Sequence, residues 1–258
     1  MKKLIIILFV VMLVCTGCGK EEKKTVINDK VFPEEMEDDL FFDYYDETIK
    51  IMEEMSLEEK ANLTSGKNFW ETQNYDHLGI PSIFLADGPH GVRKQAGASD
   101  HLGLNESLKA TCFPTASAMA NTFNVNLAKE MASYLGLEAK SQHVNILLGP
   151  GMNIKRNPLC GRNFEYFSED PYLAGKLASS YIKGAQELGI SSCIKHFACN
   201  NQEERRMVYN ALVDERALRE IYLTAFEIAV KEAKPWTIMN AYNKLNGTYC
   251  AENKWLLT

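Results

Sequence analysis

Short apolar runs and longer amphipathic stretches alternate along most of this chain, and this alternation constrains the fold more than any other feature. The apolar runs are nearly free of polar residues, a pattern typical of strands that are buried on both faces. Strands that alternate with helices predict an α/β protein with a parallel sheet covered on both faces. The expected strands are 80–86, 144–148, 191–195 and 236–242, and the expected helices between them are 124–142, 170–188 and 214–233.

Capping residues mark where these helices begin. Asn124 and Asp214 are good N-cap residues, and Asp170 is followed by a proline at the first helical position. Upstream, residues 41–55 have apolar side chains at helical spacing, and Ser56 with Glu59 forms a capping box that opens another helix. A last helix is expected to begin near residue 253.

Polar side chains gather where the predicted strands end. Asp87 follows the first strand, the segment 156–162 follows the second, Lys195 and His196 end the third, and Tyr242 ends the fourth. The carboxyl ends of parallel strands form the ligand edge in both TIM barrels and doubly wound sheets. Carboxylates accept hydrogen bonds while Arg and Lys only donate them, so such a cluster suits a hydroxyl-rich molecule.

Each of these residues also has a purely structural interpretation. The aspartate of an Asp-Gly-Pro sequence is commonly a turn former, and Lys195 with His196 could be a satisfied core pair. Arg206 lies beside Glu203 and Glu204, so it could belong to a solvated ion cluster. The residues alone leave these alternatives open.

Charge and motifs exclude several function classes. The net charge of -6 argues against nucleic acid as a partner, since phosphate binding needs a basic surface. The chain contains no GxGxxG or P-loop sequence, which disfavours nucleotide binding. Downstream of residue 18 the cysteines form no CxxC pair, so a zinc or redox site is not expected there.

The N-terminal residues carry an export signal. Two lysines precede an apolar run that is too short to span a bilayer, which predicts a signal peptide over residues 1–18. Small residues before Cys18 resemble a bacterial lipobox, so we expect lipidation of Cys18 and membrane anchoring in the cell envelope, with plain secretion as the alternative. Residues 19–40 are charged and predict a tether. Five cysteines remain downstream, an odd number that cannot all pair within the chain.

Several longer motifs carry a family resemblance. They are LADGPHGVRK, CFPTASAMANTFN, LLGPGMNIKRNPLCGRNFEYFSEDP, CIKHFACNNQEERR, VDERALREIYLTAFEIAVKEAKPWTIMNAYNKLNG and TYCAENKWLLT. In this order they resemble the N-terminal barrel domain of family 3 glycoside hydrolases of the bacterial β-glucosidase type, over residues 55–258. The resemblance implies an α/β fold, an incomplete TIM-type (β/α)8 barrel, for residues 41–258.

The resemblance also implies roles for individual residues. Asp87 is expected to accept hydrogen bonds from the 4- and 6-hydroxyls of a glucose-like ring, and no cofactor or metal is implied. The implied substrate-binding residues are Asp87, Arg162, Lys195, His196, Arg206 and Tyr242. The related N-acetylglucosaminidase branch is disfavoured, because Lys195-His196-Phe197 continues as Ala-Cys-Asn-Asn and not as a KHFPGHG-like motif.

The catalytic carboxylates are expected elsewhere. In this family the nucleophile lies on the strand after the Tyr242 strand, so it is expected beyond Thr258, and the acid/base glutamate lies in a C-terminal domain. We therefore expect a fragment of a retaining exo-β-glucosidase that is inactive by itself. The alternatives are a β-xylosidase of the same family and a non-catalytic sugar-binding lipoprotein.

Overall fold

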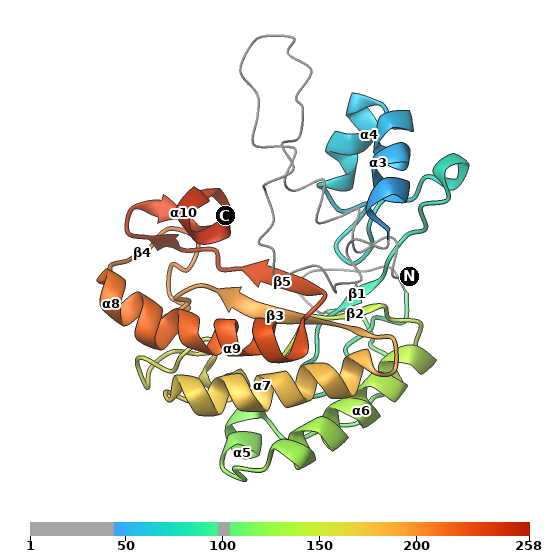
Figure 1. The fold of residues 1–258 in the computed structure, drawn as a ribbon. Coiled ribbons are helices and arrows are strands. Elements are labelled where there is room, and N and C mark those ends of the chain that lie inside the picture. The colour runs from blue at the N-terminus through green and yellow to red at the C-terminus, as the bar shows by residue number, and fades with distance from the viewer. Residues whose placement is uncertain (1–43, 98–103) are drawn as a thin grey trace. The chain divides into compact units, whose positions relative to one another are not determined.

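The computed structural model describes residues 44–97 and 104–258 (Figure 1). These residues belong to two compact units that divide between Ile83 and Phe84. The predicted signal peptide, the tether and Cys18 lie outside the described residues. Within the part of the chain that is described, no helix is both long enough and apolar enough to cross a bilayer.

The first unit contains two short helices, as the sequence predicts. Helix α3 spans Tyr45–Glu54 and α4 spans Leu57–Leu63. The predicted capping box is present, because the Ser56 hydroxyl accepts from the Glu59 N–H and the Glu59 carboxylate accepts from the Ser56 N–H. Beyond α4, a 3-10 turn at Asp76–Leu78 completes the regular structure of this unit.

The second unit is built on a parallel sheet, which confirms the predicted α/β class. Its strands are β1 (Leu85–Ala86), β2 (Ile146–Leu147), β3 (Ser191–Phe197) and β5 (Thr237–Asn240). They pair in the order β1-β2-β3-β5, and every pair is parallel. The first strand is shorter than the predicted 80–86, in keeping with Pro81, which lacks an N–H for a ladder bond.

Helices connect these strands, and the predicted caps hold them. Helix α6 (Val125–Ser141) begins after Asn124, whose side chain accepts from two backbone N–H groups. Helix α7 (Pro171–Gln186) is capped by Asp170, and α8 (Glu215–Ala217) by Asp214. The chain then continues through η4 (Leu218–Leu223) into α9 (Thr224–Ala233), and a short helix α5 (Ala116–Ala120) precedes α6.

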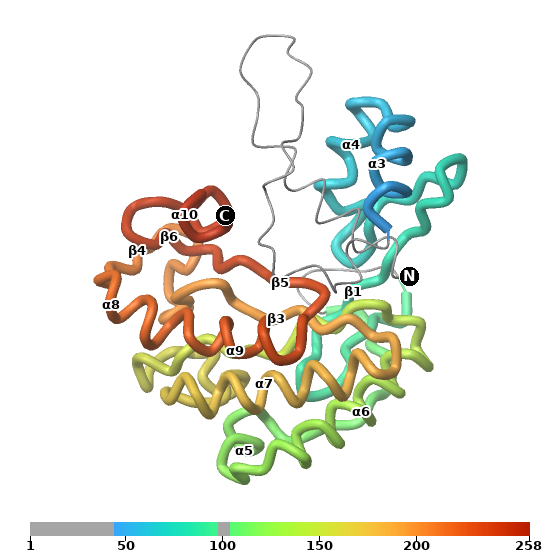
Figure 2. The backbone as a smooth tube through the Cα atoms, viewed as in Figure 1, coloured from blue at the N-terminus to red at the C-terminus, as the bar shows by residue number. Residues whose placement is uncertain are grey.

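The long helices lie on one side of the sheet. Figures 1 and 2 show α6, α7 and α9 side by side below the strands. Their backbones approach closely, since a Cβ at Gly184 of α7 would lie 2.3 Å from the Lys129 carbonyl of α6. These three helices therefore cover one face of the sheet. One-sided cover is the arrangement of a barrel wall, because helices surround a barrel on its outside only.

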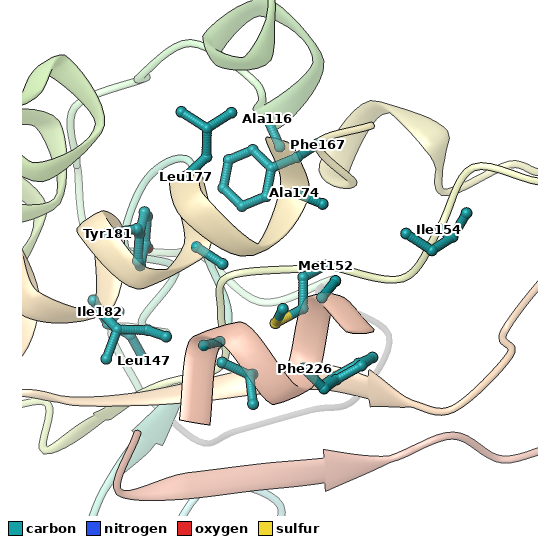
Figure 3. Packing of buried hydrophobic residues seen from close by; sticks show 14 of the residues in the cluster. Ala116, Leu147, Met152, Ile154, Phe167, Ala174, Leu177, Tyr181, Ile182 and Phe226 are labelled. Carbon is teal, nitrogen blue, oxygen red and sulfur yellow. The ribbon is translucent and has the colours of Figure 1, made fainter. Parts of the chain in front are cut away.

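The helix predicted over 214–233 contains a π-helical turn, η4. A π turn holds more residues than an α turn, so it shifts the apolar stripe around the helix. Leu218, Tyr222 and Ala225 are buried as the 3.6-residue period requires, but Ile221 is 40% exposed. Phe226 of α9 is buried in the core (Figure 3).

The core lies between the sheet and the helices. Leu147 of β2 belongs to the same buried cluster as Leu177, Tyr181 and Ile182 of α7, and it lies beside Ile182 (Figure 3). Burying a large apolar side chain contributes roughly 1.5–3 kcal/mol. This layer therefore holds the strands in register, and the strand ends in turn position the loops described below.

A second, three-stranded sheet was not predicted. It consists of β4 (Asn210–Ala211), β6 (Lys244–Leu245) and β7 (Thr248–Tyr249), with β4 parallel and β7 antiparallel to β6. The turn between β6 and β7 is Asn246-Gly247, and both residues have positive φ, as a tight hairpin requires. After a 3-10 turn (Cys250–Glu252), α10 (Lys254–Leu257) begins at Asn253, as expected.

Cysteines of the described residues are all free thiols. Cys160, Cys193, Cys199 and Cys250 are buried, while Cys112 is exposed. Burial raises the pKa of the Cys193 thiol to about 11, so it packs as a small neutral side chain.

Candidate functional site

A cleft of about 520 Å³ opens at the carboxyl ends of the parallel strands in the second unit. Its volume falls within the range of sites for small organic ligands. Charged side chains from three consecutive strand ends enter its wall together. It is lined by Asp87, Gly88, Pro89, His90, Gly91, Val92, Arg93, Leu108, Ala110, Thr111, Cys112, Arg162, Phe164, Glu165 and Lys195.

Lys195 connects two sides of this cleft. Its side chain is only 2% exposed, and its Nζ lies 3.8 Å from Asp87 Oδ1 and 3.8 Å from Glu165 Oε1. Its backbone is tied to the segment after β2, since the Met152 N–H donates to the Lys195 carbonyl. A buried ammonium needs anionic partners. The two carboxylates supply them and leave Asp87 partly exposed to a ligand.

Arg162 and Glu165 also line the cleft, next to Lys195. The Arg162 guanidinium donates to the Glu165 carboxylate, and both side chains are largely buried. The two residues bracket the 3-10 turn η3 (Asn163–Glu165), which places them one turn apart. One Glu165 oxygen therefore faces both Arg162 and Lys195, and this pairing fixes two cations at the cleft wall.

The Asp87 loop is shaped by glycine. Gly88 has a φ of +121°, and a Cβ there would lie 1.8 Å from the Gly91 carbonyl. The loop closes where the Arg93 N–H donates to the Asp87 carbonyl at 2.9 Å. The predicted turn is thus present, and it holds the Asp87 side chain beside Lys195.

His196 lies next to the cleft cations in a bulge of β3. The register with β5 shifts between Lys195 and Phe197, so the regular alternation of the strand is interrupted there. The ring is 3% exposed, and its Nδ1 is 2.8 Å from the Tyr166 hydroxyl. Burial, and then the charges of Arg162, Lys195 and Arg206, hold the pKa of His196 well below its ordinary value.

Arg206 and Tyr242 form a pair at the edge of the site. The Arg206 guanidinium carbon lies 5.2 Å from the centre of the Tyr242 ring, and Arg206 Nη1 donates to Glu203 Oε2 at 2.9 Å. Arg206 is 40% exposed and is not part of the cleft lining. It is therefore a half-buried member of an ion pair, intermediate between a solvated charge and a buried one.

The six predicted residues thus fall into two groups. Asp87, Arg162 and Lys195 line one cleft, while Arg206 and Tyr242 stack beside it. His196 lies next to Lys195 in β3, and the charges of Arg162, Lys195 and Arg206 all lower the pKa of its ring. Sequence reasoning missed three buried partners that hold these side chains, Glu165, Tyr166 and Asn200, whereas it named Glu203 as a possible ion-pair partner of Arg206.

His90 is a neutral histidine at the cleft. Among the described residues neither of its ring nitrogens has a hydrogen-bond partner. Burial, and then the charge of Lys195, lowers the pKa of His90 to about 4. A histidine with this environment gains nothing from protonation in the folded chain.

The two depressed histidines predict a loss of stability in mild acid. In the unfolded chain each histidine binds a proton near pH 6.5, whereas folded His90 binds one only near pH 4. The unfolded state therefore holds more protons between these values, and the free energy of unfolding falls as the pH is lowered through that window. Urea midpoints between pH 7 and about 5, above the carboxylate range, measure the slope. His90→Gln should flatten the dependence of stability on pH, whereas His143→Gln, at an exposed position, should leave it unchanged. If His90→Gln also left the slope unchanged, the lowered pKa of His90 would be contradicted.

The arrangement is suited to gripping hydroxyl groups. Arg162 and Lys195 supply only donors, and Asp87 supplies acceptors, so the cleft offers a polyol hydrogen-bond donors and acceptors together. In the described ranges, no group of three or more His, Cys, Asp or Glu side chains could hold a metal ion.

Comparison with known proteins identifies the family. Residues 48–258 match the model of the glycosyl hydrolase family 3 N terminal domain. The chain belongs to glycosyl hydrolase family 3. Family 3 relatives include the thermostable beta-glucosidase B of Acetivibrio thermocellus, which is 57% identical over 209 residues. The exo-alpha-(1->6)-L-arabinopyranosidase of Bifidobacterium longum is 48% identical over 212 residues.

The alignments cover most of this chain but a small part of each relative. The alignment with the beta-glucosidase covers 81% of this chain, and the alignment with the arabinopyranosidase covers 82%. Each alignment covers 28% of the relative's own length. Solved structures are matched over a similar share of this chain and of their own length. Beta-glucosidase 3B from Thermotoga neapolitana in complex with alpha-D-glucose is 46% identical, with a TM-score of 0.75, and is matched over 81% of this chain and 31% of its own.

Proposed function

We propose that this chain provides the sugar-gripping part of a β-glucosidase that removes terminal β-D-glucosyl residues. The observation that carries the proposal is the cleft in which Asp87, Arg162 and Lys195 converge. The acceptors of Asp87 and the fixed donors of Arg162 and Lys195 match a ring whose hydroxyls both donate and accept. Relatives named as β-glucosidases, including one solved with glucose, support a glucose-like ring in particular.

The proposed chemistry is retaining hydrolysis. It needs two carboxyl groups about 5–5.5 Å apart, one free to attack the sugar and one able to give a proton. The carboxylates beside the cleft are committed to cations, since Glu165 pairs with Arg162 and Lys195. In our proposal, therefore, the residues of this chain bind and orient the sugar, and the nucleophile and the acid/base group come from segments outside this sequence.

A pentose is the second candidate substrate. One relative is named as an L-arabinopyranosidase, and a pentopyranose lacks the hydroxymethyl group of glucose. Asp87 distinguishes the two kinds of sugar. Its two carboxylate oxygens can bind the 4- and 6-hydroxyls of glucose together, but only the 4-hydroxyl of a pentose. A strong preference for glucosides over xylosides and arabinopyranosides would favour the two-hydroxyl role.

Hydrolysis of aryl glycosides tests the activity. The longest protein that contains this sequence should be assayed on p-nitrophenyl β-glucoside, β-xyloside and α-L-arabinopyranoside, with the 258-residue chain in parallel. We expect the glucoside to be the best substrate of the longer protein. Glucose binding without hydrolysis in either protein would favour the sugar-binding lipoprotein, and the absence of both would contradict the proposal.

Asp87→Asn should reduce the binding of the transition state more than it reduces the stability of the fold. The change keeps the shape of the side chain but removes the charge that strengthens hydrogen bonds to sugar hydroxyls, each of which contributes about 1.5–3 kcal/mol. We expect kcat/KM for the glucoside to fall roughly 10- to 100-fold. Asp76→Asn, at an exposed turn of the first unit, is the matched control and should leave kcat/KM unchanged. Equal kcat/KM values for Asp87→Asn and the native protein would remove Asp87 from the site.

A further inference from the structure

A buried chain of hydrogen bonds runs from Glu203 through Asn200 and Tyr166 to His196. We propose that this chain makes Tyr166 a positioning residue, which holds His196 as the neutral tautomer with its hydrogen on Nε2. His196 then offers a hydrogen-bond donor, and never an acceptor, to a ligand that reaches the free edge of the ring.

The first step is the orientation of the Asn200 amide. Glu203 accepts from Arg206 Nη1 on one carboxylate oxygen, at 2.9 Å, and faces Asn200 with the other, at 2.8 Å. An ionised carboxylate offers only acceptors, so the Asn200 atom that faces it must be the NH2 group. The opposite orientation would place two oxygens against each other in a half-buried position.

The backbone of Asn200 is fixed as well. The Asn200 N–H donates to Asn153 Oδ1 at 2.8 Å, and Asn153 Nδ2 donates back to the Asn200 carbonyl at 3.1 Å. Both residues are almost fully buried. The Asn200 amide therefore has a defined position and a defined rotation.

The second step passes this orientation to Tyr166. The same Asn200 Nδ2 lies 2.9 Å from the Tyr166 hydroxyl oxygen, so its second hydrogen is donated there. The Tyr166 hydroxyl is fully buried, so its own hydrogen also needs an acceptor, and among the contacts of the described residues His196 Nδ1, 2.8 Å away, is the group that can accept it. A ring nitrogen that accepts carries no hydrogen. A neutral His196 must consequently carry its hydrogen on Nε2.

The third step is the charge of the ring. Burial and the cations Arg162, Lys195 and Arg206 lower the pKa of His196 well below its ordinary value, and burial raises the pKa of Tyr166 far above its own. The proton therefore stays on the tyrosine, and the ring stays neutral. A protonated ring would donate from both nitrogens and would leave the Tyr166 hydrogen without an acceptor inside the core.

The consequence for recognition rests on the proposed function. With His196 as an Nε2–H donor, the ring would add a third donor to those of Arg162 and Lys195 at the cleft, whereas Asp87 is the partly exposed carboxylate that presents acceptors. The site then distinguishes the hydroxyls of a sugar by role, because those near the three donors must accept and those near Asp87 must donate.

Nitrogen NMR of the histidine rings tests the tautomer directly. In the 15N-labelled 258-residue chain at neutral pH, His196 should show an unprotonated Nδ1 and a protonated Nε2, assigned by comparison with His196→Gln. Tyr166→Phe removes only the hydroxyl and should return His196 to a mixture of tautomers. Tyr181→Phe, which removes another buried hydroxyl that bonds to the Pro89 carbonyl, should leave the His196 signals unchanged.

The outcomes separate this inference from the proposed function. A protonated Nδ1 in the native chain overturns the inference, even if Tyr166→Phe fails to fold, and so does a folded Tyr166→Phe chain with native His196 signals. These readouts need no sugar. If the tautomer is as expected and glucose does not bind, the proposed function fails alone; if both hold, Tyr166→Phe should raise the Kd for glucose about 10-fold, the loss of one well-oriented hydrogen bond.

Discussion

Replacing Lys195 with methionine is expected to abolish most of the affinity for sugar and to destabilise the fold as well. Methionine fills a similar volume but carries no charge. Among the described contacts the buried Glu165 then keeps Arg162 as its one cationic partner, and Asp87 loses its ion pair with residue 195. Removing one partner from a buried ion pair costs about 3–5 kcal/mol. We expect a loss near the lower figure, about 3 kcal/mol, because Arg162 stays in place. The Kd for glucose should rise about 100-fold, as for the loss of a charge-assisted hydrogen bond.

Lys176→Met is the matched control for this change. Lys176 also pairs with a glutamate, Glu232, but both side chains are more than a third exposed, and such pairs contribute between about 0 and 1 kcal/mol. Urea unfolding and glucose titration of both variants measure the two effects. A Lys195→Met chain that loses stability but keeps its glucose affinity would support the core-pair interpretation and contradict the role in binding.

Gly184→Val is expected to disrupt the packing of α6 against α7. A Cβ at position 184 would lie 2.3 Å from the Lys129 carbonyl and 3.1 Å from the Ala132 side chain. The nearer obstacle is backbone within a helix, so it cannot turn aside as a flexible side chain can. Overpacking of this kind costs about 1–3 kcal/mol, and we expect at least the upper value, about 3 kcal/mol, because the helices must separate. The midpoint of urea unfolding measures it.

Gly97→Val provides the comparison at an open position. A Cβ at Gly97 meets no atom of the described residues within 4 Å, so the same change there should alter stability by less than about 0.5 kcal/mol. If Gly184→Val were as stable as Gly97→Val, then α6 and α7 would not pack as closely as described.

Sequence patterns predicted the sheet and the long helices because their signals are local. Asn124, Asp170 and Asp214 each cap the helix that follows, and the buried strands follow from continuous apolar runs. The π turn at η4 has no comparable signal, since it depends on how the whole helix packs. The hairpin between β6 and β7 had one, Asn246-Gly247, whose meaning as a tight turn was overlooked because the flanking strands are so short.

The charged members of the site were predictable, but their support was not. Asp87, Lys195 and His196 stand at strand ends, where the topology of a parallel sheet brings side chains together. Asn200 and Tyr166 are 34 residues apart in sequence, and their hydrogen bond exists only after β3 and the η3 segment are packed together. Sequence spacing carries no information about such a contact.

The most direct test of the central claim is a titration of the 258-residue chain with glucose, followed by calorimetry. We predict saturable binding of one glucose per chain, weakened at least 10-fold by Asp87→Asn and about 100-fold by Lys195→Met, with Lys176→Met unchanged. Binding that is absent from the folded native chain, or that persists equally in both cleft variants, would contradict a sugar-gripping role for this cleft.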